Sequence, residues 1–85
     1  MTISQIQIDI LHAYNNTPNH KNINQLISEY DNKMLYDNCI ELQQQGYFTE
    51  HIKFHLTMDK KLYSTRIGKN PILTDKGLEA IQNNN

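Results

Sequence analysis

The sequence predicts one small domain of the α+β class over residues 1–85, and three observations support this prediction. Apolar residues recur at helical spacing through the first half of the chain. After Gly46 the spacing changes to alternation, which is the pattern of a half-buried antiparallel strand. A threonine followed by a short amphipathic segment then predicts a last helix. At 85 residues, the chain is long enough for one hydrophobic core.

The first helix is expected over residues 2–16. Four apolar residues fall on one face of it: Ile3, Ile6, Ile10 and Ala13. Residues 6–10 also alternate as a strand does, but the apolar pattern persists for about three turns, which favours a helix. Ile8 lies outside the apolar face. It is therefore expected to be either a partly exposed side chain or a contact in a homodimer.

A pair of helices joined by a short break is expected next. The first spans residue 23 to about residue 30, and Asp31 or Asn32 can cap the start of the second. The second spans about residues 33–45 and has an apolar face formed by Leu35, Cys39 and Leu42. Gly46 ends it, because glycine readily adopts the positive φ that follows a helix. A short helix, a turn and a longer helix make a helix-turn-helix candidate.

A β-hairpin is expected after this helix pair. Residues 52–58 alternate between apolar and polar types, and residues 62–67 are rich in β-branched and aromatic residues. The polar stretch between them can form the turn. The alternation assigns four side chains to the buried face of the first strand: Ile52, Phe54, Leu56 and Met58.

The last segment is predicted to return to the sheet and end as a helix. Residues 68–71 interrupt the second strand, and Ile72 and Leu73 are expected to rejoin the sheet. Thr74 caps a helix that runs to about residue 82. Gly77 within this helix costs about 1 kcal/mol relative to alanine, so close packing against a neighbour is expected there. The core is expected to include Leu35, Leu42, Phe54 and Leu78.

The predicted order of helix, helix-turn-helix, two-stranded hairpin and helix is that of a winged helix, with the hairpin as the wing. LQQQGYF at residues 42–48 resembles the end of the recognition helix in winged-helix regulators. ILTDKGL at residues 72–78 looks like the leucine-threonine-x-lysine-glycine element that follows the wing in PadR-like and MarR-like proteins. With its long wing and terminal asparagines, the chain is most similar to the YjcQ-like family, small winged-helix proteins of Gram-positive bacteria and their phages.

This resemblance implies a recognition helix in the major groove of DNA and a wing on the DNA backbone or in the minor groove. It also implies a dimer formed through the first and last helices. No functional residue of the YjcQ-like family is carried over to this chain.

The charges modify that expectation. Residues 1–45 hold two basic and five acidic residues, whereas residues 51–70 hold five basic residues and one acidic residue. Most DNA affinity comes from neutralising phosphates, so the wing is the predicted contact. The outer face of the longer helix carries Asp37 and Glu41, which phosphate repels. The predicted DNA-binding residues are Lys33, Gln44, Lys53, Lys60, Lys61, Arg66 and Lys69.

The predicted function is a small cytoplasmic DNA-binding regulator, of a phage or mobile element, with wing-dominated and weakly sequence-specific binding. The alternative is a winged-helix module that binds another protein, as an adaptor or inhibitor, and does not bind DNA. Ile8 and Tyr36 are the predicted partner or dimer contacts. No apolar run reaches the length of a membrane span, and no signal peptide is expected.

Neither an enzyme nor a cofactor or metal site is expected. The chain has no phosphate-binding glycine loop, zinc-protease motif or nucleophile elbow. On a strand, His51 and His55 would stand roughly 13 Å apart, whereas zinc–nitrogen bonds are about 2 Å long. His12 and His20 have no ligand partners nearby in the sequence. Cys39 falls on an apolar helix face, which predicts a buried, inert thiol.

Overall fold

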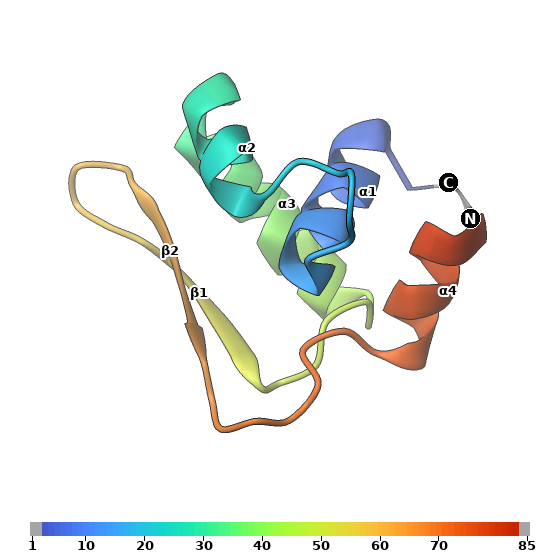
Figure 1. Ribbon diagram of the computed structural model, residues 1–85. Helices are drawn as coiled ribbons and strands as arrows, with labels where there is room; N and C mark the ends of the chain where they lie inside the picture. Colours follow the sequence, from blue (N-terminus) through green and yellow to red (C-terminus); the bar gives the residue numbers. More distant parts are fainter. Residues whose placement is uncertain (1–2, 84–85) are drawn as a thin grey trace.

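The computed structural model describes residues 3–83 as four helices and one two-stranded antiparallel sheet, in the predicted order (Figure 1). The elements are α1 (Gln5–Asn15), α2 (Ile23–Glu29), α3 (Asn32–Gln44), β1 (Ile52–Leu56), β2 (Leu62–Arg66) and α4 (Asp75–Asn83). The prediction of an α+β fold is confirmed. Within residues 3–83, none of the helices combines the length and the apolar character that crossing a membrane requires.

Side-chain caps set where the first three helices begin. The Ser4 hydroxyl accepts from the backbone N–H of Gln7, and the Gln7 side chain accepts from the N–H of Ser4, which forms a capping box. Asn22 caps α2 in the same way. The Asp31 carboxylate accepts from the N–H of Met34 at 3.0 Å, so the predicted cap of α3 is confirmed. Because Ser4 is the cap, α1 begins at Gln5; the predicted start at Thr2 lies outside the described residues.

The core lies between α1, α3, the hairpin and α4. The predicted face of α3 is fully buried within a cluster to which every helix and both strands contribute, and α3 packs against α1 and the hairpin (Figure 1). Three aromatic rings join α1 to the hairpin by edge-to-face contacts, with centroids 5.1–5.6 Å apart: Tyr14, Phe48 and Phe54. The main buried residues are Ile10, Leu11, Leu26, Leu35, Cys39, Leu42, Phe48, Ile52, Phe54, Leu62, Leu73 and Ile81.

The hairpin is held against α3 at two places. Near the start of α3, the Asn32 side-chain oxygen accepts from the backbone N–H of Leu62 at 2.9 Å. Near its end, the Gln43 amide donates to the carbonyl oxygens of Thr49 and Ile52 at 2.9 and 2.8 Å. These bonds satisfy backbone groups next to the strands and fix the orientation of the hairpin relative to α3.

The segment after α3 holds the start of α4, which packs against α1. Gly46 has φ 85°, as expected for the residue after a helix. Ile72 and Leu73 do not rejoin the β1–β2 sheet as predicted; instead Leu73 pairs with Phe48 in an isolated antiparallel bridge, because the chain returns beside the segment just after Gly46. The Thr74 hydroxyl accepts from the N–H of Gly77 at 3.1 Å and so caps α4 as predicted.

The predicted close approach at Gly77 is confirmed. A Cβ atom at this position would stand 2.3 Å from the carbonyl oxygen of Tyr47. That oxygen is fixed, because it accepts from the backbone N–H and from the hydroxyl of Thr74. Glycine is therefore required by the contact between α4 and the chain just after Gly46.

The predicted exposure of Ile8 is wrong. Ile8 is only 6% exposed, although it lies outside the apolar face chosen from the sequence. Since α1 packs against α2, α3 and α4 (Figure 1), more than one face of this helix is covered. Burial within one chain removes the surface that a dimer contact through Ile8 would need.

Three other predicted burials differ from the structure, and the first is Leu56, which is only half-buried at the end of β1. Met58 is fully exposed, because β1 ends at Leu56 and the alternation does not continue into the turn. Leu78 is half-buried and packs at the edge of the core, whereas Ile81 of the same helix is buried. The core predicted from Leu35, Leu42 and Phe54 is confirmed.

Candidate nucleic-acid interface

The strand register decides which hairpin side chains face away from the helices. Ile52 and Phe54 are buried, and directly opposite residues on paired strands share a face. The alternate positions therefore form the other face. The pairing continues past the strands, because the N–H of Ile67 donates to the carbonyl of His51 and that of Thr57 to the carbonyl of Lys61. We call this side the outer face; it comprises His51, Lys53, His55, Thr57, Lys61, Tyr63, Thr65 and Ile67.

The lysines of the hairpin region are exposed and carry no ion pair. The ion pairs found among residues 3–83 join Lys21 to Glu29 and Lys33 to Asp37, and neither includes a hairpin residue. The acidic residue of the hairpin turn, Asp59, accepts a hydrogen bond from the Thr57 hydroxyl. The hairpin therefore presents uncompensated positive charge at Lys53, Lys60, Lys61 and Lys69.

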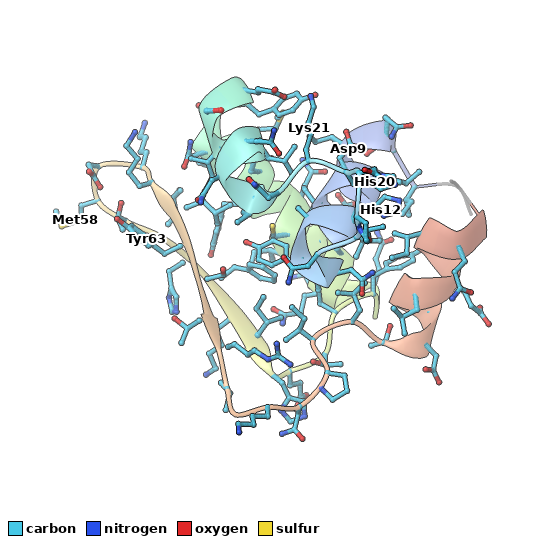
Figure 2. The ribbon with its side chains drawn as sticks, in the orientation of Figure 1. Asp9, His12, His20, Lys21, Met58 and Tyr63 are labelled. Atoms are coloured by element: carbon cyan, nitrogen blue, oxygen red, sulfur yellow. The ribbon has the colours of Figure 1, made fainter. Side chains whose placement is uncertain are left out.

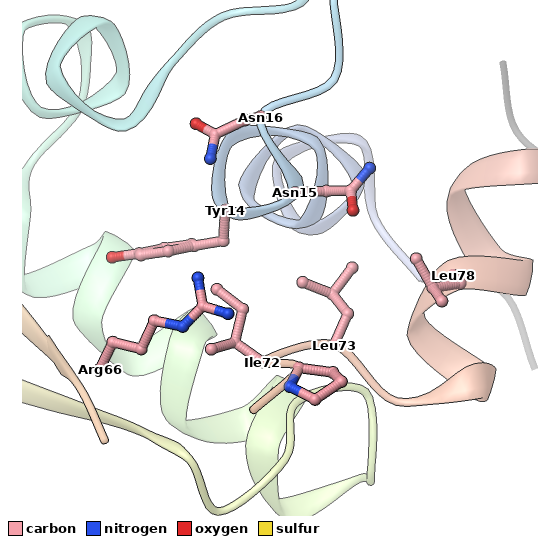
Figure 3. A pocket seen from close by; sticks show the side chains of 8 residues that line it. Tyr14, Asn15, Asn16, Arg66, Ile72, Leu73 and Leu78 are labelled. Atoms are coloured by element: carbon pink, nitrogen blue, oxygen red, sulfur yellow. The ribbon is translucent and has the colours of Figure 1, made fainter. Parts of the chain in front are cut away.

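Arg66 lies apart from these lysines. It is opposite Ile52, on the side of the hairpin that faces the helices. Its guanidinium donates to the carbonyl oxygens of Asn70 at 2.9 Å and Lys69 at 3.5 Å. It also lines an open hollow of about 240 Å³ beneath Tyr14 (Figure 3). Of the predicted DNA-binding residues in the hairpin, Arg66 is thus the one whose charge is turned toward the protein.

The outer surface of α3 offers little free positive charge. The Lys33 ammonium donates to the Asp37 carboxylate at 2.7 Å, and this hydrogen bond is the main reason why the pKa of Lys33 is raised. Glu41 accepts from the side-chain amide of Gln7 at 3.2 Å, so it lies toward α1. Gln44 is exposed at the end of the helix. Lys33 follows Asn32, whose side chain bonds to the hairpin at Leu62, whereas Gln44 lies at the other end of α3.

Tyr36, the predicted partner contact on α3, packs mostly against the core of its own chain. Tyr36 is half-buried and contacts the core, as does Ile40.

Cys39 is fully buried, and desolvation raises the pKa of its thiol to about 12. A thiol with this pKa stays protonated and unreactive near neutral pH.

The contact between His12 and His20 could not be foreseen from their spacing in the sequence. Their rings stack with centroids 3.7 Å apart, because the loop before α2 passes back over α1 (Figure 2). Nδ1 of His12 is hydrogen-bonded to the Thr17 hydroxyl at 3.0 Å, and its buried Nε2 has no partner within the described residues. In residues 3–83, no three or more His, Cys, Asp or Glu side chains gather as metal ligands.

This pair predicts that the protein loses stability in mild acid. The pKa of His12 lies below its usual 6.5, first because burial disfavours the charged ring and second because His20 repels it; Asp9 acts in the opposite direction. Above pH 6.5 His12 is neutral in both the folded and the unfolded protein, and the fold has its full stability. As the pH falls, the unfolded chain binds the proton first because its pKa is the higher one, so the free energy of unfolding decreases until the pH is below the folded-state pKa. Urea unfolding between about pH 7 and pH 5 should show the decrease. His20→Ala, at an exposed position, should make the decrease smaller, and a stability that rises toward pH 5 would contradict the assignment.

Comparison of the chain with protein-family models, curated sequences and solved structures gives no match. The class of the protein is therefore defined by its own architecture, an α+β fold in which a basic hairpin packs on the third of four helices. The resemblance of residues 42–48 and 72–78 to winged-helix families stays a prediction.

Proposed function

We propose that this protein is a winged-helix DNA-binding regulator that acts in the cytoplasm and contacts DNA mainly through its hairpin, the wing. The observation that carries this proposal is the charge of residues 51–70, where five basic residues accompany one acidic residue. The lysines are exposed and unpaired, while the acid is engaged with Thr57.

The physical reason is the release of counterions from DNA. Each phosphate neutralised by a lysine or arginine releases condensed cations, and this term supplies most of the non-specific affinity. Lys53, Lys60 and Lys61 are available for such contacts without breaking an internal ion pair. Lys33 on α3 is less available, because a phosphate would have to replace Asp37 as its partner.

This arrangement supports weak sequence specificity. Phosphate contacts position a protein on DNA but do not read bases. A helix that reads the major groove commonly uses arginine, lysine, asparagine or glutamine, and on the outer surface of α3 the available side chain of this kind is Gln44. We therefore assign the hairpin the main role in affinity.

Replacing Lys60 and Lys61 by alanine should weaken binding to a duplex of random sequence. Each lost phosphate contact lowers the slope of log K against log salt by about 0.9, so the slope should fall by roughly two. The measurement is a mobility-shift or anisotropy titration at several salt concentrations.

The matched control is the double variant Lys21→Ala, Lys33→Ala, which removes the same charge from positions outside the hairpin, one in the loop before α2 and one in α3. It should change the affinity and the salt slope much less. Equal losses in both double variants would contradict the hairpin assignment. If the wild-type protein does not bind DNA at any salt concentration, the alternative of a protein-binding module is favoured.

A further inference from the structure

The outer face of the hairpin combines positive charge with exposed rings. Its eight positions include two lysines, two histidines, a tyrosine and an isoleucine, and none is acidic. Tyr63 is 60% exposed and Ile67 is 44% exposed. Among the described residues, three of the four exposed large hydrophobic side chains lie in the hairpin region: Met58, Tyr63 and Ile67. Phosphate contacts alone do not explain why these side chains remain in water.

We propose that the outer face binds single-stranded nucleic acid, with unpaired bases stacked on Tyr63 and His55. Lys53 and Lys61 then lie beside the phosphates. This inference rests on the proposed function, because it assigns the preferred form of nucleic acid to the same hairpin.

The register supports a common stacking surface. Tyr63 lies directly opposite His55, and opposite residues have Cβ atoms about 4.5–5.5 Å apart on one face. Lys53 and Lys61 are each two residues from this pair along their strands, so they project from the same face roughly 7 Å away. An aromatic centre with a cation on each side is the arrangement that binds unpaired strands.

The surface is also held in place before any ligand binds. Asn32 and Gln43 fix the inner side of the hairpin to α3, and Phe54 packs into the core. At the turn, the Thr57 hydroxyl accepts from the N–H of Lys61 at 3.0 Å. Tyr63 and Met58 lie toward the end of the hairpin that projects from the helices (Figure 2), where a strand has room to pass. A preformed site loses less entropy on binding.

Single strands fit this face better than duplex DNA. In a duplex the faces of the bases are covered by their neighbours, so the ring of Tyr63 cannot stack on them. Because this face has no carboxylate, no group on it repels a polyanionic strand. Stacking tolerates any base, so the binding should depend little on sequence.

The test compares a labelled single strand of about 15 nucleotides with the matching duplex, by fluorescence anisotropy. We expect the wild-type protein to bind the single strand at least about 10-fold more tightly. Stacking contributes about 1–3 kcal/mol per base, so Tyr63→Leu should weaken single-strand binding by about 5- to 150-fold. Tyr63→Phe keeps the ring and should bind nearly as the wild type does. Because Tyr63 is exposed, both variants should fold, which circular dichroism can verify.

The possible outcomes separate this inference from the proposed function. If Tyr63→Leu binds as tightly as wild type while Lys60→Ala, Lys61→Ala weakens binding, stacking is overturned and hairpin-dominated DNA binding stands. Duplex binding as tight as single-strand binding would likewise overturn the preference. If the wild-type protein binds neither form, both proposals fail and the outer face is better explained as a protein contact.

Discussion

Leu42→Ala should lower the free energy of unfolding by about 2–5 kcal/mol. Leu42 is 1% exposed and lies on the face of α3 that meets the rest of the core. Truncation removes apolar area from the core and leaves a cavity that the surrounding elements fill only in part. Since small domains have a total stability of about 5–15 kcal/mol, this loss is a large part of the whole.

Urea or thermal unfolding measures the effect, and Gln44→Ala is the matched control. Gln44 lies two residues further along α3 and is exposed, so its replacement should change stability by about 0.5 kcal/mol or less. A large loss in Leu42→Ala beside a small one in Gln44→Ala would verify which face of α3 is buried. Similar effects at both positions would mean that α3 is rotated about its axis.

Gly77→Ala should also destabilise the protein, although the same change stabilises most helices. In an open helix, alanine is favoured over glycine by about 1 kcal/mol. Here the new Cβ would stand 2.3 Å from the carbonyl oxygen of Tyr47, a backbone atom that cannot rotate away. To make room, α4 would have to move and weaken the hydrogen bonds of Thr74 to Gly46 and Tyr47. Overpacking of this kind costs about 1–3 kcal/mol or more.

For Gly77→Ala, the informative result is whether the free energy of unfolding rises or falls. Glu79→Ala in the same helix is an exposed control and should leave the unfolding transition nearly unchanged. A Gly77→Ala protein that is more stable than wild type would mean that α4 does not rest on the carbonyl of Tyr47. A destabilised variant would verify the contact that joins α4 to the segment after α3.

The structure refines the charge argument for the hairpin in two places. By sequence, Arg66 counts as one of five basic residues of the hairpin, but its guanidinium bonds to the carbonyls of Asn70 and Lys69 on the inner side. Lys33 likewise counts as a free cation, but it is paired with Asp37. Lys53, Lys60, Lys61 and Lys69 remain as the cations that are free to meet phosphate, and Lys60 and Lys61 are the residues to vary first.

The elements of this protein are determined largely by local sequence. The apolar spacing of Leu35, Cys39 and Leu42, the cap at Asp31 and the glycine at position 46 define α3 without reference to the rest of the chain. Alternation around Phe54 does the same for β1. These signals act between residues a few positions apart, so they can be found in the sequence. The element order and the α+β class follow from them.

Tertiary packing decided what depends on neighbours distant in sequence. Ile8 is buried on a helix against which three other helices pack, which no periodicity within α1 reveals. Arg66 faces inward because of its register with Ile52, and His20 stacks on His12 because of the path of a loop. Gly77 suggested a close contact, but only the folded chain identifies the carbonyl of Tyr47 as the atom that requires it. Burial, strand register and contact distance are properties of the assembled chain, whereas helix and strand patterns are properties of short segments.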